Sequence, residues 1–272
     1  MSKKRRDIPV FNHPITETHC HLDYMDVDQL DSVINDAQEI GIHRIVTIAT
    51  EPDNLDKVIN IAASHSHIYC TQGIHPHDAK SLNTEILDKI RHQCTPSNKV
   101  VAVGEIGLDY HYEYSDRKLQ QAAFESQLQI AIDLNLPVVI HSREADEDTQ
   151  AILKNFSRDM RSKGVIHSFT SGIALAEYCL SEDFMLGFNG ILTFNKADNV
   201  REVLSMTPND CFVVETDAPY LTPVPYRGTE NEPKYLPFII ERIATEKGLS
   251  IDELLVQLEI NAQKLFPGVL YT

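Results

Sequence analysis

The sequence has few cysteines, and no two of them are closely spaced. Five cysteines occur among 272 residues, an odd number without a Cys-x-x-Cys pair. This excludes a disulfide framework and indicates free thiols in a reducing compartment, so we expect a cytoplasmic protein. Its stability then depends on a packed core, for which a hydrophobic fraction of 42% is sufficient.

Long apolar runs are also missing. No stretch approaches the ~18 uninterrupted apolar residues that a membrane-spanning helix needs, so we expect no contact with a membrane. Residues 3–6 are Lys-Lys-Arg-Arg, but no apolar segment follows them, which excludes a secretory signal. Such a cluster is typical of a nuclear localisation signal or of an arm that binds nucleic acid. A terminus that is disordered or extended over residues 1–14 is the simpler interpretation.

Positive charge is in deficit. Lys and Arg together number 24 against 40 Asp and Glu, which gives a formal net charge of −16. This argues against broad non-specific binding to duplex nucleic acid, because such binding needs clustered cations that displace counterions. It does not exclude an enzyme that takes one strand end into a metal-lined pocket, where the metal supplies the positive charge.

Two common catalytic motifs are absent as well. The chain has no Gly-x-Ser-x-Gly sequence and no P-loop, which argues against a serine nucleophile and against ATP-driven chemistry. No cysteine has the surroundings of an activated thiol. Nothing in the sequence indicates an obligate protein partner.

What is present is a regular alternation of apolar runs and amphipathic segments. We expect strands over residues 15–19, 43–49, 68–73, 99–104, 137–140, 164–166, 184–188 and 211–214. We expect helices over residues 28–40, 54–63, 84–91, 116–134, 144–156, 173–180, 199–204, 236–246 and 251–265. Eight strands separated by helices imply a parallel sheet, and eight such units in this length predict a single-domain (β/α)8 TIM barrel over residues 15–272.

Six residues of metal-binding type lie at or just past the ends of these apolar runs. They are His19, His21, Glu105, His141, His167 and Asp217. The carboxyl ends of barrel strands converge on one face, where active sites are assembled from several strands. The six side chains are therefore predicted to meet there and to hold two divalent cations.

The local patterns support this prediction to different degrees. His19 and His21 have the period-2 spacing that places both side chains on one face of a strand, whereas Cys20 between them points the other way and is interpreted as packing. Glu105 ends a buried run, where a carboxylate is costly unless it is paired or binds metal. His141 and His167 each follow an apolar run and precede a serine. Each residue alone has a structural alternative, a salt-bridged or hydrogen-bonded core residue; the full set favours metal.

A mechanism follows as a hypothesis. His19, His21, Glu105 and Asp217 would hold one cation, and Glu105, His141 and His167 the other. Metal coordination lowers the pKa of water, and Asp217 would position the attacking water and take its proton. The target is an electrophilic phosphorus or carbonyl carbon. Imidazole ligands suit Zn or Mn, and phosphoryl transfer often uses Mg, so all three metals stay open.

Other polar residues suit contacts to substrate. His75 and His77 follow the third strand and suit a phosphate or a leaving group, although a surface role is nearly as plausible for His77. Arg143, two residues after His141, can donate two parallel hydrogen bonds to a phosphate. Arg227 lies in a proline-rich, loop-like stretch over residues 223–233.

Several motifs resemble those of one family. They are Glu17-Thr18-His19-Cys20-His21-Leu22-Asp23, Gly73-Ile74-His75-Pro76-His77, Gly104-Glu105-Ile106-Gly107-Leu108-Asp109-Tyr110, His141-Ser142-Arg143 and Glu215-Thr216-Asp217-Ala218-Pro219-Tyr220-Leu221. The chain, from about residue 15 to 266, resembles a TatD-type metal-dependent hydrolase, a deoxyribonuclease-like branch of the amidohydrolase superfamily. The resemblance implies a TIM barrel, two divalent cations and hydrolysis of DNA, commonly from a 3′ end. The family's metal ligands match all six residues named above, and its substrate contacts match His75, Arg143, Tyr110 and Arg227.

The chain departs from the family pattern at two positions. Ala218 stands where the family often has Ser, and Glu230 stands where Lys or Arg usually precedes Asn. A negative charge near the mouth would weaken attraction to a polyanion, so an alternative is hydrolysis of another ester or amide, such as D-aminoacyl-tRNA. A binding protein with a structural metal is a third interpretation. The intact ligand set argues against it, because structural zinc sites are normally closed and four-coordinate.

Overall fold

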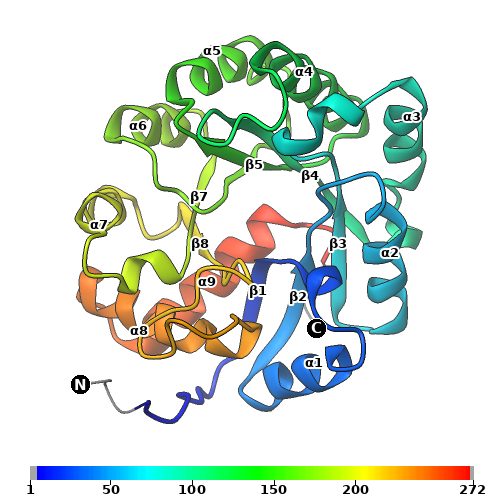
Figure 1. The fold of residues 1–272 in the computed structure, drawn as a ribbon. Coiled ribbons are helices and arrows are strands. Elements are labelled where there is room, and N and C mark those ends of the chain that lie inside the picture. The colour runs from blue at the N-terminus through cyan, green and yellow to red at the C-terminus, as the bar shows by residue number, and fades with distance from the viewer. Residues whose placement is uncertain (1–4, 270–272) are drawn as a thin grey trace.

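Eight parallel strands follow one another in the sheet in chain order, in residues 5–269, the part of the chain that the computed structural model describes (Figure 1). They are β1 Ile15–Cys20, β2 Ile42–Thr47, β3 Ile68–Gln72, β4 Val100–Asp109, β5 Val138–Arg143, β6 Gly164–Ile166, β7 Met185–Phe188 and β8 Phe212–Val214. The chain just past β8 meets β1, where the amide of Asp217 donates to the carbonyl of His19 at 3.0 Å. The sheet thus curls into a barrel, and the predicted (β/α)8 TIM barrel is confirmed.

Helices surround these strands on the outside (Figure 1). They are α1 Leu30–Glu39, α2 Leu55–Ser64, α3 Thr84–Gln93, α4 Arg117–Leu134, α5 Asp146–Phe156, α6 Ile173–Ser181, α7 Asp198–Met206 and α8 Leu236–Lys247. The helix and strand boundaries agree with the expected ones to within a few residues, except at β4. No helix within residues 5–269 has the length and apolar character needed to cross a membrane.

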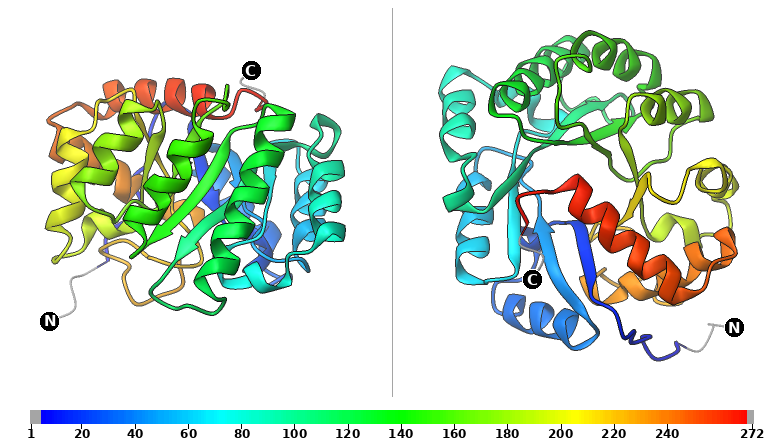
Figure 2. Two further views of the ribbon diagram at one scale, coloured as in Figure 1. Left: turned by 90° about the horizontal axis from the view of Figure 1, so that it is seen from above. Right: turned by 180° about the vertical axis from the view of Figure 1, so that it is seen from behind.

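The last helix, α9 Ile251–Leu265, lies across the end of the barrel where the strands begin (Figure 2). Its residue Glu259 accepts hydrogen bonds from Thr16 at the start of β1 and from Arg44 in β2. Phe266, just beyond the helix, is fully buried with the inward-facing residues of the strands. Because this end is closed, the opposite end is the one left to bind a substrate.

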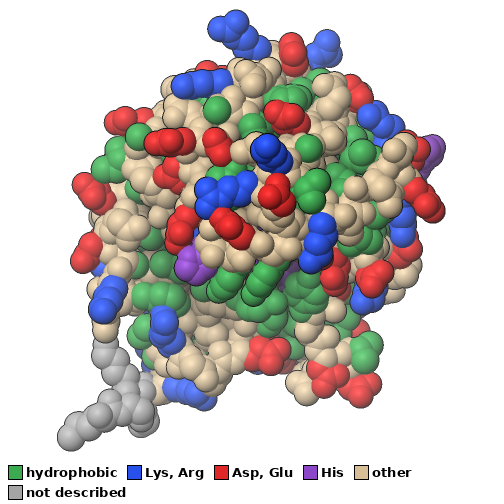
Figure 3. All heavy atoms as spheres, turned by 45° about the horizontal axis from the view of Figure 1, so that its top comes forward, with side chains coloured by type: hydrophobic (Ala, Val, Ile, Leu, Met, Phe, Trp, Pro, Cys, Tyr) green, Lys and Arg blue, Asp and Glu red, His purple; other side chains and the backbone are tan. Residues whose placement is uncertain are grey.

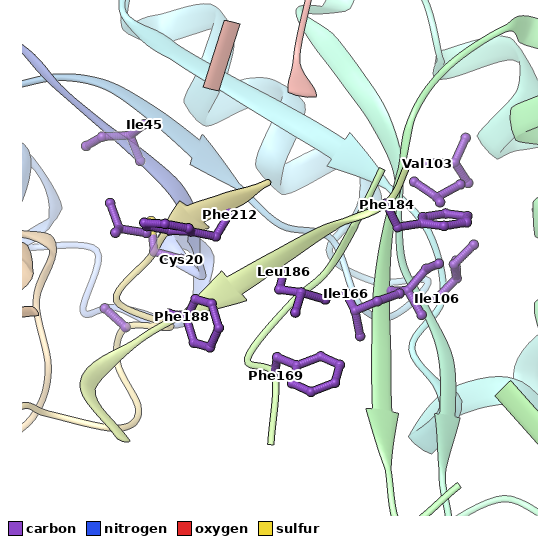
Figure 4. Packing of buried hydrophobic residues seen from close by; sticks show 14 of the residues in the cluster. Cys20, Ile45, Val103, Ile106, Ile166, Phe169, Phe184, Leu186, Phe188 and Phe212 are labelled. Atoms are coloured by element: carbon purple, nitrogen blue, oxygen red, sulfur yellow. The ribbon is translucent and has the colours of Figure 1, made fainter. Parts of the chain in front are cut away.

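The core has an inner cluster inside the barrel and a larger outer cluster between the strands and the helices. Figure 4 shows part of the outer cluster around β7, where Phe188 packs edge-to-face on Phe212 of β8 with 5.9 Å between ring centroids. Cys20 is fully buried in the same cluster, so its side chain points away from the barrel mouth. Burying these rings supplies much of the driving force for folding, about 1.5–3 kcal/mol for each large apolar side chain.

The expected end of the fourth strand at residue 104 is wrong. β4 continues to Asp109, and Glu105 therefore lies within the strand. The register against β5 slips by one residue between Val103 and Ile106, which is a β-bulge. The bulge frees the amide of Glu105 to donate to the carbonyl of Ala49, just after β2, at 2.8 Å. A bulge re-aims the side chain beside it, and here it turns Glu105 into the barrel mouth.

The basic N-terminal cluster is only partly described, because Lys3 and Lys4 lie outside residues 5–269. Residues 5–14 form neither helix nor strand. Arg6 forms an ion pair with Glu241 of α8 and lies over the ring of Phe238, and Arg5 lies over the ring of Tyr226. These contacts hold the segment against α8 and the loop that precedes it.

Candidate metal centre

Glu105 lies at the centre of the six predicted ligands. Its Oε1 is 2.8 Å from Nε2 of His167 and 3.0 Å from Nδ1 of His141, and its Oε2 is 3.4 Å from Nε2 of His19. The side chain is buried between the barrel strands. One carboxylate thus faces imidazoles from β1, from β5 and from the end of β6.

Asp217 faces the two histidines of β1. Its Oδ1 is 3.4 Å from Nε2 of His21 and 3.6 Å from Nε2 of His19, and these two nitrogens are 3.4 Å apart. Asp217 has a left-handed backbone with φ of 58°. Asp is one of the few residues that tolerate this conformation, and such strained positions concentrate at functional sites.

The side chains form three overlapping groups whose donor atoms lie within 4.8 Å of one another, as metal ligands would. They are His19, His21 and Asp217; His19, Glu105 and His167; and His75, Glu105 and His141. All six predicted ligands are brought together. The structure adds His75, whose Nε2 lies 3.5 Å from Oε1 of Glu105, closer to the ligands than its predicted role as a substrate contact implies.

Two carboxylates that sequence reasoning did not single out contact His141 and His167 on the side of each ring that faces away from Glu105. Oδ2 of Asp109 is 3.0 Å from Nε2 of His141, and Oε1 of Glu215 is 3.4 Å from Nδ1 of His167. A carboxylate behind a ligating histidine fixes the tautomer and the ring orientation. The available signal was proximity in the sequence, because Asp109 lies four residues after Glu105 in β4 and Glu215 lies two residues before Asp217.

A third buried carboxylate joins the two ends of the sheet. Glu17 accepts hydrogen bonds from the amides of His19 and Thr216 at 3.0–3.1 Å. It therefore ties the backbone that carries His19 to the backbone that carries Asp217. No group of possible metal ligands among residues 5–269 includes Glu17 or a cysteine.

The electrostatics of the centre favour a bound cation. Burial alone would raise the pKa of Glu105 and Asp217, but the surrounding imidazoles outweigh it and hold both values below the ordinary range. Against the effect of burial, Glu105 raises the pKa of His167 well above its ordinary value. Burial and the neighbouring His141 hold the pKa of His75 well below its ordinary value. Ionised carboxylates with imidazole nitrogens around them are the donor set that Zn, Mn and related divalent metals take, so these residues fit a metal.

The centre opens into a cavity of about 760 Å³. Predicted site residues in its lining include His75, Arg143 and Asp217, and its wall also carries Tyr24, Tyr112, Tyr114 and Tyr220. The cavity therefore combines a polar floor with an aromatic rim.

On the outer surface, acidic and basic side chains are interspersed on the face drawn in Figure 3.

Tyr110 and Arg227 do not line this cavity. The hydroxyl of Tyr110 donates to Asp148 at 2.6 Å, and the guanidinium of Arg227 lies 3.6 Å from the ring centroid of Phe194. Glu230 is exposed and is also absent from the lining. The roles expected for these three residues in substrate binding stay predictions.

Known proteins share both the sequence pattern and the fold. The model of the family described as "TatD related DNase" matches residues 16–267. The chain is 36% identical over 251 residues to "Uncharacterized metal-dependent hydrolase YabD" of Bacillus subtilis, covering 92% of this chain and 98% of that protein. It is 36% identical over 243 residues to "3'-5' ssDNA/RNA exonuclease TatD" of Erwinia amylovora, covering 87% of this chain and 93% of that protein.

A solved structure agrees with these sequence matches. The TatD homologue YJJV from Escherichia coli superposes with a TM-score of 0.88 at 27% identity, covering 93% of this chain and 98% of that one. Family, relatives and fold coincide with the cluster of imidazoles and carboxylates at the barrel mouth. The chain therefore belongs to the family of TatD-related DNases and is a metal-dependent hydrolase that acts on ester bonds.

Proposed function

We propose that the chain is a two-metal deoxyribonuclease that removes nucleotides from the 3′ end of a DNA strand. The observation that carries the proposal is the position of Glu105, whose Oε2 faces His19 and His21 at 3.4 and 3.9 Å while its Oε1 faces His141 and His167 at 3.0 and 2.8 Å. A carboxylate in this position can bridge two cations. His19, His21 and Asp217 would hold one with Glu105, and His141 and His167 the other.

The residues of the chain then divide the chemistry among them. Two bound divalent cations, Mg, Mn or Zn, would lower the pKa of water and neutralise charge on the phosphate. The neighbouring imidazoles hold the pKa of Asp217 below its ordinary range, and Asp217 lines the cavity, so its carboxylate can orient the attacking water and accept its proton. Arg143 and His75, in the same wall, would contact the phosphate oxygens. Asp109 and Glu215 keep His141 and His167 in one orientation.

Two observations support a strand end as the substrate. The relative from Erwinia amylovora is named as an exonuclease of single-stranded DNA and RNA. The net charge of −16 makes long-range attraction to duplex nucleic acid weak, whereas a terminal phosphodiester needs only the cavity. The five cysteines are all free in the structure, which supports the further proposal of a cytoplasmic location.

The test uses single-stranded DNA labelled at the 5′ end and, separately, at the 3′ end. Chelated protein is reloaded with Mg, Mn or Zn, beside an Asp217→Asn variant and an Asp159→Asn control at an exposed site. We expect a metal-dependent ladder that shortens from the 3′ end. In Asp217→Asn the rate should fall by about 10³-fold or more while the fold is retained.

Two results would count against the proposal. Near-normal turnover by Asp217→Asn would remove Asp217 from the role of base. Folded, metal-loaded protein that cleaves no DNA would redirect the search to other esters, with D-aminoacyl-tRNA as the next substrate to test.

A further inference from the structure

We propose that Tyr112 and Tyr114 form a base-stacking platform that holds an unpaired nucleobase of the strand whose end occupies the cavity. The inference rests on the proposed nuclease function and deepens it, because it makes the base, and not only the phosphate, part of what the site recognises. It selects single-stranded substrates, since a base inside a duplex has both faces covered by its stacked neighbours.

The two rings are exposed at the rim of the cavity. Tyr112 is 47% and Tyr114 is 59% exposed, and both line the same cavity as the metal centre. Their rings are stacked with 5.4 Å between centroids and 13° between planes. Large aromatic side chains so exposed contribute little to the core, whereas the exposed part of such a stack offers a π face to a base of any sequence.

The platform is built in advance of substrate. The ring of His77 meets both tyrosines edge-on, at 4.8 Å from Tyr114 and 5.5 Å from Tyr112. His77 in turn pairs with Oδ2 of Asp109 at 3.0 Å, and Oδ1 of Asp109 accepts the amide of Tyr112 at 3.0 Å. Asp109 also holds His141. One carboxylate therefore sets the position of the tyrosines relative to the metal centre.

Charge near the platform favours a nucleic-acid strand along the tyrosines. The guanidinium of Arg143 lies 4.8 Å from the ring centroid of Tyr112 and lines the cavity, where it can meet the phosphate that accompanies a stacked base. The neighbouring hollow of about 650 Å³ is lined by four acidic side chains, Glu144, Asp146, Glu147 and Asp148, and by two basic ones, Arg117 and Arg143. Because acidic groups outnumber basic ones in this hollow, it is less favourable for a polyanion, and we expect the strand to leave the cavity over the tyrosines.

The experiment combines kinetics with a direct signal of stacking. Steady-state hydrolysis of single-stranded DNA is measured for Tyr112→Ala, Tyr114→Ala and the matched Tyr→Phe variants, with Tyr178→Ala on α6 as a control outside the cavity. A strand carrying 2-aminopurine near its 3′ end is also titrated against the same variants in an Asp217→Asn background with Mn²⁺, where emission falls as the base stacks. Thermal unfolding checks the fold, and Tyr→Leu variants replace any Ala variant that unfolds.

We expect KM to rise about tenfold for each ring removed, with kcat changed by less than about twofold. The Phe variants should behave like the wild type, because stacking needs the ring and not the hydroxyl. Quenching of 2-aminopurine should be lost in the Ala variants. An abasic site at the stacked position should raise the KM of the wild type by the same factor of about ten. It should not raise the KM of the Ala variants further, since one interaction cannot be removed twice.

Unchanged KM and unchanged quenching in both Ala variants would overturn the platform. An abasic site that raises the KM of the Ala variants as much as that of the wild type would overturn it too. These results differ from failure of the proposed function, in which the wild type hydrolyses no nucleic acid at all. The quenching titration does not depend on turnover, so it decides the stacking proposal in that case too.

Discussion

Oδ2 of Asp109 and Nε2 of His141 lie 3.0 Å apart, on the neighbouring strands β4 and β5. The other ring nitrogen of His141, Nδ1, faces Glu105 at 3.0 Å. His141 is thus clamped between a carboxylate at the centre and one behind it. With Asp109 accepting the proton on Nε2, Nδ1 is left with a lone pair for a metal.

Replacing Asp109 should therefore weaken metal binding without removing a ligand. Asp109→Asn keeps the shape but loses the charge that orients His141, and we expect metal affinity to fall about 10- to 100-fold. Calorimetric titration of the chelated protein with Mn²⁺ or Zn²⁺ measures the change. Asp133→Asn, at an exposed ion pair with Arg91, is the control. Equal affinities in the two variants would show that Asp109 does not support the centre.

Metal should stabilise the fold as well as supply chemistry. The buried carboxylates and imidazoles come from β1, β4, β5 and the segments after β6 and β8, so a cation that joins them binds only the folded chain. We expect chelation to lower the melting temperature, and Mn²⁺ at 100 times its Kd to restore about 2.7 kcal/mol per site. Differential scanning calorimetry measures this. Glu105→Gln should lose most of the metal-dependent increase; an increase of wild-type size in that variant would place the metal elsewhere.

The thiols should differ sharply in reactivity. Burial raises the pKa of Cys70, Cys94 and Cys179 to about 12, and Cys20 is fully buried. Burial and the neighbouring Asp210 raise the pKa of Cys211 as well, but Cys211 is only partly buried, which leaves it more accessible than the other four. We expect Ellman's reagent to label one thiol quickly in the native protein and all five in denaturant, because the thiolate is the reactive form. Cys211→Ser should abolish the fast phase, and a fast phase that survives this change would contradict the assignment.

The arrangement of the strands and the six predicted ligands followed from the sequence for one physical reason. Parallel strands in a barrel all end on the same face, so residues at the ends of apolar runs meet whatever their distance along the chain. His141 and His167, 26 positions apart in the sequence, have ring nitrogens 3.3 Å apart. Whether these six residues hold metal stays a prediction.

Other parts of the site depend on contacts that a single sequence does not display. Asp109 and Glu215 look like ordinary carboxylates at a barrel mouth until their partners His141 and His167 are in place. The stacking of Tyr112 on Tyr114 depends on a loop conformation that Asp109 holds. His75 approaches Glu105 because of the turn at the start of the short helix Pro76–Ser81, where its side chain accepts the amide of His77.

The bulge in β4 is the clearest case, because it depends on a close approach between two strands. A Cβ atom at Gly104 would lie 2.7 Å from Cβ of Val139 and 2.8 Å from its carbonyl oxygen. Gly104→Ala must therefore push β4 away from β5, and we expect it to lower the free energy of unfolding by about 1–3 kcal/mol, as overpacking of a core does. Because the bulge aims Glu105, the variant should also bind Mn²⁺ more weakly than its stability loss alone explains. Urea unfolding and calorimetry measure the two effects.

Gly172→Ala is the matched control, since the nearest atom to its Cβ would be a carboxylate oxygen of Asp146 at 3.6 Å, an ordinary contact. If Gly104→Ala were as stable as this control, the close approach to Val139 would not be what limits position 104 to glycine.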